Sequence, residues 1–341
     1  MMTRRSSSVT IREVAKQAGV SIATVSRYIN QTATVSPEVA TRLDEVMETL
    51  KYVPHSAARN LATQKTNSIG LLLTYNIYGD FFAPMLRGIE EVVAESGFNL
   101  LISSSISNSN NSHSQALGPH NSDGILGYAD SLSEANLTHY FHSKFPVVLI
   151  YRSSPPHLSI PSVTVENKTA AKGIVDHLIE VHGRRRIVFL RGPEHQEDSY
   201  WREMGYRASL EAHSIDYDAD LVCPGEFERE VAQTSMIELI MAGVEFDAVF
   251  TGDDDAAIGV LAALREMGKR VPEDVSVVGF DDQRTSPYLT PSLTTVRAPT
   301  EEVGRVAARQ IINLIRGRQA DPLTLLPTEI VIRNSCGCQS R

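Results

Sequence analysis

The chain has few cysteines and no long apolar run. Only Cys223, Cys336 and Cys338 occur among its 341 residues, an odd number with none near the N-terminus, which excludes a disulfide framework and a zinc ribbon and favours a reducing compartment. No apolar stretch reaches the roughly 18 residues that a membrane span needs, and the first eight residues are polar with no apolar core after them. We therefore expect a cytoplasmic protein without a membrane partner.

Motifs for catalysis are also missing. The sequence has no Gly-x-Gly-x-x-Gly or Gly-Lys-Ser/Thr phosphate loop, no Gly-x-Ser-x-Gly and no His-Glu-x-x-His. His139 and His142 could share one face of a helix, but no third ligand accompanies them, so we interpret them as surface residues. Cys336 and Cys338 are expected to be free thiols. The sequence thus predicts no metal site and no cofactor, and it argues against an enzyme.

The charge is unevenly distributed along the chain. With 42% apolar and 21% charged residues, the composition is that of a folded protein of two or three domains. Its net charge of −9 would argue against nucleic acid as a partner if it were evenly spread. Residues 1–65, however, contain nine Lys and Arg against five Asp and Glu, a net of +4, which leaves −13 for the remainder. The basic segment can approach a polyanion that the acidic remainder would repel.

Residues 1–53 are expected to form a small all-α domain. Thr10, Ser21 and Ser36 can each cap a helix, and Gly19 allows a tight turn between the first two. Helix, tight turn and helix in this order are typical of a helix-turn-helix, which places the start of its second helix in the major groove of DNA. A three-helix bundle that binds protein is the alternative, and the basic charge disfavours it.

Side chains of the second helix suit contacts with bases and phosphates. Arg27 can bind guanine through two hydrogen bonds, whereas Ile22 and Ala23 offer apolar contact to a thymine methyl group. Phosphate contacts are expected from the hydroxyl groups of Ser21, Thr24, Ser36 and Tyr52. The residues expected to meet DNA are therefore Ser21, Ile22, Ala23, Thr24, Ser26, Arg27, Ser36 and Tyr52.

From Ile69 onward, apolar strand candidates alternate with amphipathic helices. The expected strands are 69–73, 100–103, 124–126, 147–151, 163–165, 187–190, 248–251 and 275–280, and the expected helices are 82–96, 133–142, 169–182, 203–213, 230–242 and 254–267. A further strand, a helix over 300–316 and a strand over 328–333 follow. Such alternation implies parallel sheets with right-handed crossovers. Two such lobes would form a ligand-binding cleft at the carboxyl ends of their strands.

A run of motif residues extends from Val9 to Arg27 and is followed by Asn30 and by residues 35–38 and 50–54. Through these residues the first part of the chain resembles the DNA-binding head of the lactose and galactose repressor family. This resemblance implies a helix-turn-helix head followed by an α/β core of two doubly wound parallel-sheet lobes, similar to periplasmic binding proteins. The implied domains are the head 1–53, a hinge helix 54–66 and a core 67–341, with an N-lobe of about 67–162 plus 294–322 and a C-lobe of about 163–293 plus 323–341.

In that family the hinge helix folds only on operator DNA, and the residue matching Leu61 enters the minor groove. The residues themselves make this plausible. A short, Ala-rich segment is marginal as an isolated helix, and an apolar Leu61 near Arg59 suits a wedge that kinks the minor groove. Packing of Leu61 against the core is the alternative. Asn30, Arg59 and Leu61 thus complete the expected DNA contacts.

The resemblance continues through the core to about Arg333 and implies residues that bind an effector. Arg202 matches an arginine that donates to ligand oxygens, and Asp281 matches an acceptor that holds the ligand from the other lobe. Phe82 and Phe227 match aromatic residues that cover the faces of a sugar or base. The other candidates are Arg152, Asp253, which stands where many relatives have Asn, and the loop residues Gln196 and Asp198.

Simpler structural roles compete with two of these assignments and account for a neighbouring aspartate. Phe82 could belong to the core, Asp281 could lie in a solvated loop, and Asp254, next to the candidate Asp253, is expected to cap the helix 254–267 rather than touch a ligand. Tyr151 replaces the Asp that sugar-responsive members usually carry before the residue matching Arg152, which weakens the transfer of any particular sugar.

The sequence therefore predicts a ligand-responsive transcriptional regulator, a repressor that binds a palindromic operator as a homodimer. The expected effector is a sugar or a sugar derivative in the cleft between the lobes. A nucleobase or nucleoside effector is the first alternative. A transport-type small-molecule binding protein without a DNA-dependent function and an α/β enzyme are alternatives from other classes.

Overall fold

The computed structural model describes residues 9–29, 33–52, 65–74, 80–105 and 116–339. The chain divides into two compact units, Met1–Thr66 and Asn67–Arg341. In the part of the chain so described, no helix combines the length and the hydropathy that are needed to traverse a lipid bilayer.

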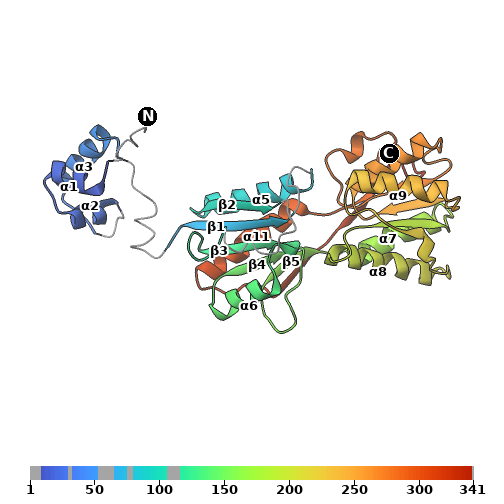
Figure 1. Cartoon of the computed structure of the whole chain (residues 1–341), viewed down its shortest axis with the longest axis horizontal. Helices are drawn as coiled ribbons and strands as arrows, with labels where there is room; N and C mark the ends of the chain where they lie inside the picture. Colours follow the sequence, from blue (N-terminus) through green and yellow to red (C-terminus); the bar gives the residue numbers. More distant parts are fainter. Residues whose placement is uncertain (1–8, 30–32, 53–64, 75–79, 106–115, 340–341) are drawn as a thin grey trace, which may run out of the picture. The chain divides into compact units, whose positions relative to one another are not determined.

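The described part of the first unit is helical, as expected (Figure 1). Its helices are α1 (Ile11–Ala18), α2 (Ile22–Ile29) and α3 (Pro37–Thr49). The Glu13 carboxylate accepts a hydrogen bond of 2.7 Å from the Thr10 backbone N–H, which caps α1. Gly19, with φ of +66°, ends α1 in the left-handed conformation that glycine adopts without strain. The Ser21 hydroxyl then accepts a bond of 3.1 Å from the Thr24 N–H and caps α2.

The first lobe of the second unit is built on a six-stranded parallel sheet with the order β11-β5-β4-β3-β1-β2. Its strands are β1 (Ser68–Thr74), β2 (Asn99–Ser105), β3 (Gly124–Tyr128), β4 (Val147–Ile150), β5 (Ser162–Val165) and β11 (Leu323–Leu326). The helices of this lobe are α5 (Phe82–Glu95), α6 (Glu134–His142) and α11 (Thr300–Ile315). Strands β1, β3 and β4 are buried throughout or nearly so, because helices cover both faces of the sheet.

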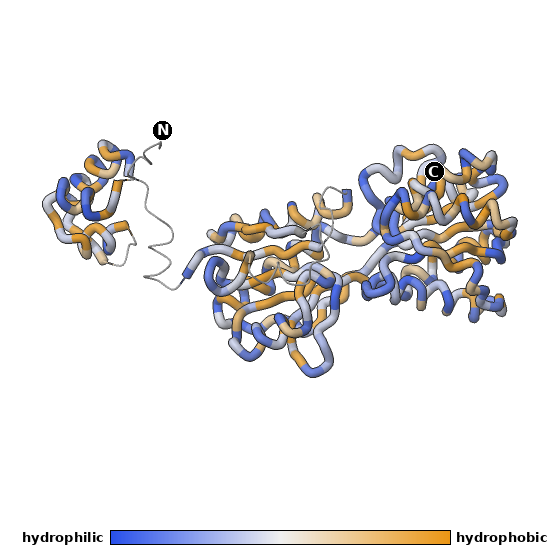
Figure 2. Tube along the Cα trace, in the orientation of Figure 1, coloured by the Kyte–Doolittle hydropathy of each residue, from blue (hydrophilic) through white to orange (hydrophobic). Residues whose placement is uncertain are grey.

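The second lobe has a four-stranded parallel sheet with the order β7-β6-β8-β9. Its elements are α7 (Lys168–Glu180), β6 (Ile187–Arg191), α8 (Glu197–Ala212), β7 (Val222–Pro224), α9 (Arg229–Met241), β8 (Ala248–Thr251), α10 (Asp254–Glu266) and β9 (Ser276–Val278). A short antiparallel pair, β10 (Thr295–Arg297) and β12 (Glu329–Val331), packs against α7. Figure 2 shows apolar residues along the strands inside both lobes and polar residues on the outer helices. The expected all-α head and two parallel-sheet lobes are confirmed.

The points at which the chain crosses between the lobes differ from the expected ones. Ser162 of β5 pairs with Leu149 and with Leu323 in the first sheet, so residues 163–165 and 323–326 belong to the first lobe, whereas the sequence placed them in the second. The residues of β10, expected in the first lobe, pair with β12 beside α7. Helix α8 also begins at Glu197, six residues before its expected start.

Candidate functional site

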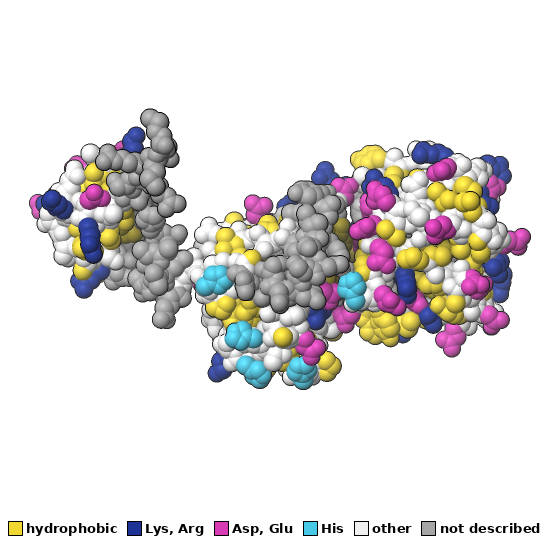
Figure 3. Space-filling model, in the orientation of Figure 1, with side chains coloured by type: hydrophobic (Ala, Val, Ile, Leu, Met, Phe, Trp, Pro, Cys, Tyr) yellow, Lys and Arg dark blue, Asp and Glu magenta, His cyan; other side chains and the backbone are white. Residues whose placement is uncertain are grey.

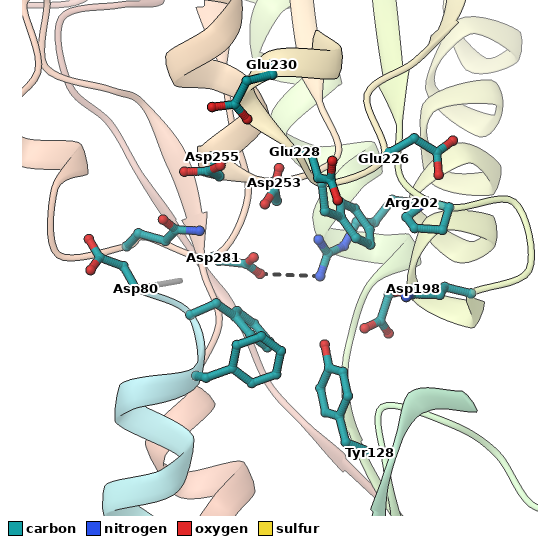
Figure 4. A pocket seen from close by; sticks show the side chains of 16 residues that line it. Asp80, Tyr128, Asp198, Arg202, Glu226, Glu228, Glu230, Asp253, Asp255 and Asp281 are labelled. Atoms are coloured by element: carbon teal, nitrogen blue, oxygen red, sulfur yellow. Dashed lines mark hydrogen bonds and ion pairs between the residues drawn. The ribbon is translucent and has the colours of Figure 1, made fainter. Parts of the chain in front are cut away.

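A cavity of about 330 Å³ lies between the lobes, at the carboxyl ends of their parallel strands. This volume is at the lower end of the range of about 300–1,000 Å³ that small-molecule sites occupy, so the cavity suits a compact ligand. Figure 4 shows the side chains that line it. They are Asp80, Phe81, Phe82, Tyr128, Pro193, Gln196, Asp198, Arg202, Glu226, Phe227, Glu228, Glu230, Asp253, Asp255, Asp281 and Gln283.

Arg202 of α8 is the centre of the polar wall. Its Nε donates to the Asn167 side-chain oxygen at 2.9 Å, its Nη1 donates to the Gly252 carbonyl, and its Nη2 lies 3.3 Å from an Asp281 carboxylate oxygen. The guanidinium also stacks on the Phe280 ring, 3.7 Å from its centroid. Its side chain is only 3% exposed. Packing and hydrogen bonds therefore fix a cation at the wall of the cavity before any ligand enters.

Asp198 and Asp281 accompany this arginine. Asp198 accepts a bond of 2.8 Å from the Asn167 side-chain amide, so Asn167 positions both Asp198 and Arg202. Burial raises the pKa of Asp198 to about 6, although Arg202 opposes the shift. Burial likewise raises the pKa of Asp281, again against the effect of Arg202. Burial disfavours the ionised form of both carboxyl groups, so hydrogen bonds donated by a ligand would stabilise their carboxylates.

Carboxyl groups dominate the lining of the cavity. Among the described residues that line it, Arg202 is the single Lys or Arg, and eight are acidic: Asp80, Asp198, Glu226, Glu228, Glu230, Asp253, Asp255 and Asp281. Acidic side chains gather along the edge of the second lobe that faces the first in Figure 3. Such a lining favours ligands with hydroxyl or amino donors and repels anions.

Two adjacent aspartates have roles that the sequence did not separate correctly. Asp253, rather than Asp254, is the N-cap of α10, and it accepts a bond of 2.9 Å from the Ala256 N–H. Asp254 is fully buried behind the cavity and accepts bonds from the Ser286 and Thr295 hydroxyl groups. Burial raises the pKa of Asp253 well above its ordinary value and that of Asp254 to about 7. The first lines the cavity, while the second holds together the loops that follow β9.

Aromatic rings form the apolar part of the site. Phe82 at the start of α5 and Tyr128 at the end of β3 meet edge to face with their centroids 5.1 Å apart, and Phe81 packs against Phe82 at 5.4 Å. Phe227 comes from the opposite lobe. A Cβ atom on Gly192 would lie 2.1 Å from the Phe227 ring, so any larger residue at this position would force the ring to move.

Seven of the eight expected effector residues line the cavity: Phe82, Gln196, Asp198, Arg202, Phe227, Asp253 and Asp281. Arg152 does not, because its guanidinium donates to the Leu132 carbonyl at 2.6 Å and lies 3.8 Å from Asp130. Asp281 was expected on the lobe opposite Arg202, but both follow strands of the four-stranded sheet and so lie on the same lobe.

Several lining residues were missed in the sequence. Glu226, Glu228 and Glu230 flank the expected Phe227 and would have been found by extending the motif on both sides. Tyr128 ends a strand that was predicted, so its place at a carboxyl end was a usable signal. Asn167 gave no signal, because its role depends on contacts with residues more than 30 positions away.

In the head, the start of α2 presents an exposed surface. Ser21, Ile22, Ala23 and Arg27 are exposed, and Ile22 is 47% exposed although it is apolar. The opposite face of α2 is buried, because Val25 packs in the small core of the head, which is formed by Val14, Ala15, Ala18, Val25, Leu43 and Val46. The surface available to DNA is thus the one expected of a second, reading helix.

The other expected DNA contacts are distributed as follows. Thr24 and Ser26 are half-buried on α2, Ser36 is exposed before α3, and Tyr52 is half-buried and packs against the core of the head. Asn30, Arg59 and Leu61 lie outside the described residues.

Comparisons with known proteins match both units. Residues 10–55 match the family described as bacterial regulatory proteins, lacI family, and residues 175–336 match a periplasmic binding protein-like domain. The HTH-type transcriptional regulator CelR of Thermobifida fusca is 32% identical over 335 residues, which cover 96% of this chain and 98% of that protein.

Solved structures of lacI-family regulators match the chain over nearly its whole length. A CelR–cellobiose complex superposes with a TM-score of 0.71 at 30% identity, covering 96% of this chain and 99% of the other. The lac repressor dimer bound to operator and the anti-inducer ONPF superposes with a TM-score of 0.84 over the same shares of the two chains. At 24% identity, the second match shows the fold alone. Together with the exposed surface of α2 and the cavity, the similarity over nearly the whole length shows that this chain belongs to the lacI family. It is a ligand-responsive, repressor-like transcriptional regulator and not an enzyme.

Proposed function

We propose that the protein is a repressor that binds a palindromic operator in the cytoplasm as a homodimer and senses a hydroxyl-rich small molecule without negative charge. The basic head with its exposed α2 surface supports DNA binding. One head offers few contacts, and two-fold symmetry doubles them on an inverted repeat. The outer face of α5, at the edge of the first lobe, is the proposed dimer surface.

The lining of the cavity is the observation that carries the proposal for the effector. Eight carboxyl groups and one guanidinium can accept from and donate to the hydroxyl groups of a sugar, while Phe82, Tyr128 and Phe227 can cover its apolar faces. A ligand carboxylate or phosphate about 4 Å from one such carboxylate would be repelled by about 4 kcal/mol at an effective dielectric constant of about 20. A neutral sugar or an amino sugar is therefore favoured over a sugar acid.

A nucleobase remains the second candidate, because the same rings could stack on a purine. It would leave most of the carboxyl groups without donors, since a base carries few N–H groups and a sugar carries a hydroxyl group on most carbons. Buried acceptors without partners cost free energy. The sugar therefore satisfies more of the cavity.

We propose that ligand binding changes the affinity for DNA through the segments that join the lobes. Asp281 lines the cavity, and the next residue, Asp282, binds Arg297 at 2.7 Å and Arg333 at 2.6 Å. Arg297 ends β10, immediately before the crossing to α11, and α11 packs on α5 through the Arg305–Glu91 ion pair. A ligand that draws the lobes together would move α11 and α5, and so change how the two heads of a dimer are held.

A thermal-shift screen tests the proposed effector class. The full chain is heated with cellobiose, glucose, galactose, glucosamine, glucuronate or adenine, each in turn. We expect a neutral sugar or glucosamine to raise the unfolding midpoint. Asp198→Asn and Arg202→Ala should remove this shift, whereas the control Arg207→Ala, on the exposed side of α8, should keep it. A shift with glucuronate or adenine alone would contradict the proposal.

DNA-binding experiments test the proposal that the protein binds a palindromic operator. Duplexes selected from a random pool by the full chain should share an inverted repeat, and affinity should fall steeply with salt. Leu61→Ala should weaken binding to the selected repeat while leaving the fold intact. Selection of a single, non-repeated site would refute binding to a palindromic operator. An equal affinity of Leu61→Ala for the repeat would refute the role of Leu61 in the minor groove.

A further inference from the structure

Four metal-ligating side chains meet in the second lobe, and none of them lines the cavity. His177 lies in the last turn of α7 and His182 follows the end of this helix, while Cys336 and Cys338 lie in the segment after β12. One donor atom from each, a ring nitrogen or a sulfur, lies within 4.8 Å of every other. We call these residues the Cys2His2 cluster. More than 150 residues separate its two halves, so the fold brings them together.

The two sulfur–nitrogen distances at Cys338 are close to those of a tetrahedral site. Cys338 Sγ lies 3.7 Å from His177 Nε2 and 3.4 Å from His182 Nε2. With Zn–S bonds of about 2.3 Å and Zn–N bonds of about 2.0–2.1 Å, the sulfur and nitrogen of a tetrahedral zinc site are about 3.6 Å apart. His177 and His182 are also separated by four residues, as in the common His-x₃₋₅-His pattern of such sites.

Hydrogen bonds donated by hydroxyl groups hold the segment around Cys336 in place. Cys336 is completely buried, and its carbonyl accepts a bond of 2.7 Å from the Ser276 hydroxyl. The neighbouring Ser335 hydroxyl donates to the Val277 carbonyl at 2.6 Å, which fixes the segment to β9. The Thr294 hydroxyl donates to Cys336 Sγ at 3.2 Å. A hydrogen bond to the sulfur stabilises a thiolate, the form that binds metals.

The residue between the two cysteines also fits a site. Gly337 has φ of +112°, which side chains rarely tolerate, and a Cβ atom there would lie 3.1 Å from His182 Nδ1. Glycine therefore lets the segment approach the imidazole closely while both flanking sulfurs turn to the same cluster. The one-residue spacing is shorter than the usual Cys-x₂₋₄-Cys, and Gly337 is what makes it possible.

We propose that the Cys2His2 cluster binds a zinc ion, which ties the segment after β12 to the end of α7. Two thiolates and two imidazoles in a tetrahedral arrangement are the ligand set that zinc prefers. On binding, each cysteine releases its thiol proton to solvent, so that Zn²⁺ is held by two thiolates and two neutral imidazoles. The sequence, in contrast, predicted two free thiols and no metal.

Metal analysis of the full chain tests this proposal. Protein produced with added zinc and freed of unbound ions on a desalting column should retain one zinc ion per chain. Cys338→Ser and His182→Gln should lose most of it, whereas Cys223→Ser in β7 and His139→Gln on α6, which lie outside the cluster, should keep it. Cys336→Ser is avoided because the residue is fully buried. Circular dichroism establishes that each variant is folded.

Two further readouts distinguish a built site from weak surface binding. Cobalt(II) in place of zinc should show thiolate-to-metal charge transfer and the intense d–d bands of a tetrahedral ion. Zinc at a hundred times its Kd should raise the unfolding midpoint by about 4–5 °C over metal-free protein, and Cys338→Ser should not respond. Wild-type protein without retained zinc, an octahedral cobalt spectrum, or equal zinc in the cluster variants and the control variants would each overturn the proposal.

Discussion

Replacing Arg202 by methionine should destabilise the core, and the loss should grow with pH. Methionine keeps much of the length of the side chain but removes the cation that is paired with Asp281 at 3.3 Å and the donor to Asn167 at 2.9 Å. Removing one partner of a buried ion pair costs about 3–5 kcal/mol. The exposed Arg207 one turn and a half along α8, paired with Glu203 at 2.6 Å, is the matched control, because exposed pairs contribute only about 0–1 kcal/mol.

The pH dependence follows from the protonation of the aspartate left behind. An Asp in an unfolded chain has a pKa of about 3.9. Burial already raises the pKa of Asp281 in the folded protein while Arg202 lowers it, so the variant should have a still higher folded pKa. The folded variant then holds a proton that the unfolded chain has released. Its stability must therefore fall as pH rises from about 4 through the folded pKa.

Urea denaturation of the full chain at about pH 5 and about pH 8 measures both effects. Arg202→Met should lose more free energy of unfolding at the higher pH, and Arg207→Met should lose little at either. Equal stability of the two variants, or a deficit of Arg202→Met that did not change with pH, would contradict the role of the buried pair of Arg202 and Asp281.

Three other changes test separate parts of the structure. Ser21→Ala removes the hydroxyl that caps α2 at 3.1 Å and should cost the head about 1 kcal/mol, lowering DNA affinity in anisotropy titrations while leaving sugar binding unchanged. Gly192→Ala should displace the Phe227 ring and weaken sugar binding by at least tenfold in calorimetry; unchanged affinity would show that the ring does not cover the ligand. Because burial raises the pKa of Asp254 to about 7, wild-type stability should fall by about 3 kcal/mol between about pH 4 and pH 7 from this group alone, and urea titrations of Asp254→Asn should lack that component.

The sequence predicted the parts of the fold that depend on local signals. Thr10, Gly19 and Ser21 define the ends of the head helices through contacts with residues at most four positions away, and such patterns are visible in one dimension. The apolar strands that lie inside the two sheets were also found, because burial on both faces leaves a continuous apolar run. Strands β7 and β11 were missed. Both are short edge strands, and Leu323 and Leu325 of β11 are about half exposed.

The candidate site was harder to predict where roles depend on distant contacts. Three consecutive aspartates, Asp253 to Asp255, all follow a strand and precede a helix, so the sequence could not tell the helix cap from the fully buried neighbour. Arg152 was expected at the cavity, yet the nearby Leu132 carbonyl binds it instead. The Cys2His2 cluster depends entirely on tertiary structure, because neither half contains enough ligands to suggest a site on its own.

We expect a ligand in the acidic cavity to set the affinity of the head for DNA. The most direct test is an anisotropy titration of the full chain onto its selected inverted repeat, with and without a saturating amount of the neutral sugar that gives the largest thermal shift. We expect the sugar to change the Kd for DNA by at least about fivefold, and to leave that Kd unchanged in Arg202→Ala. An identical Kd with and without bound sugar in the wild-type protein would show that the cavity does not control DNA binding.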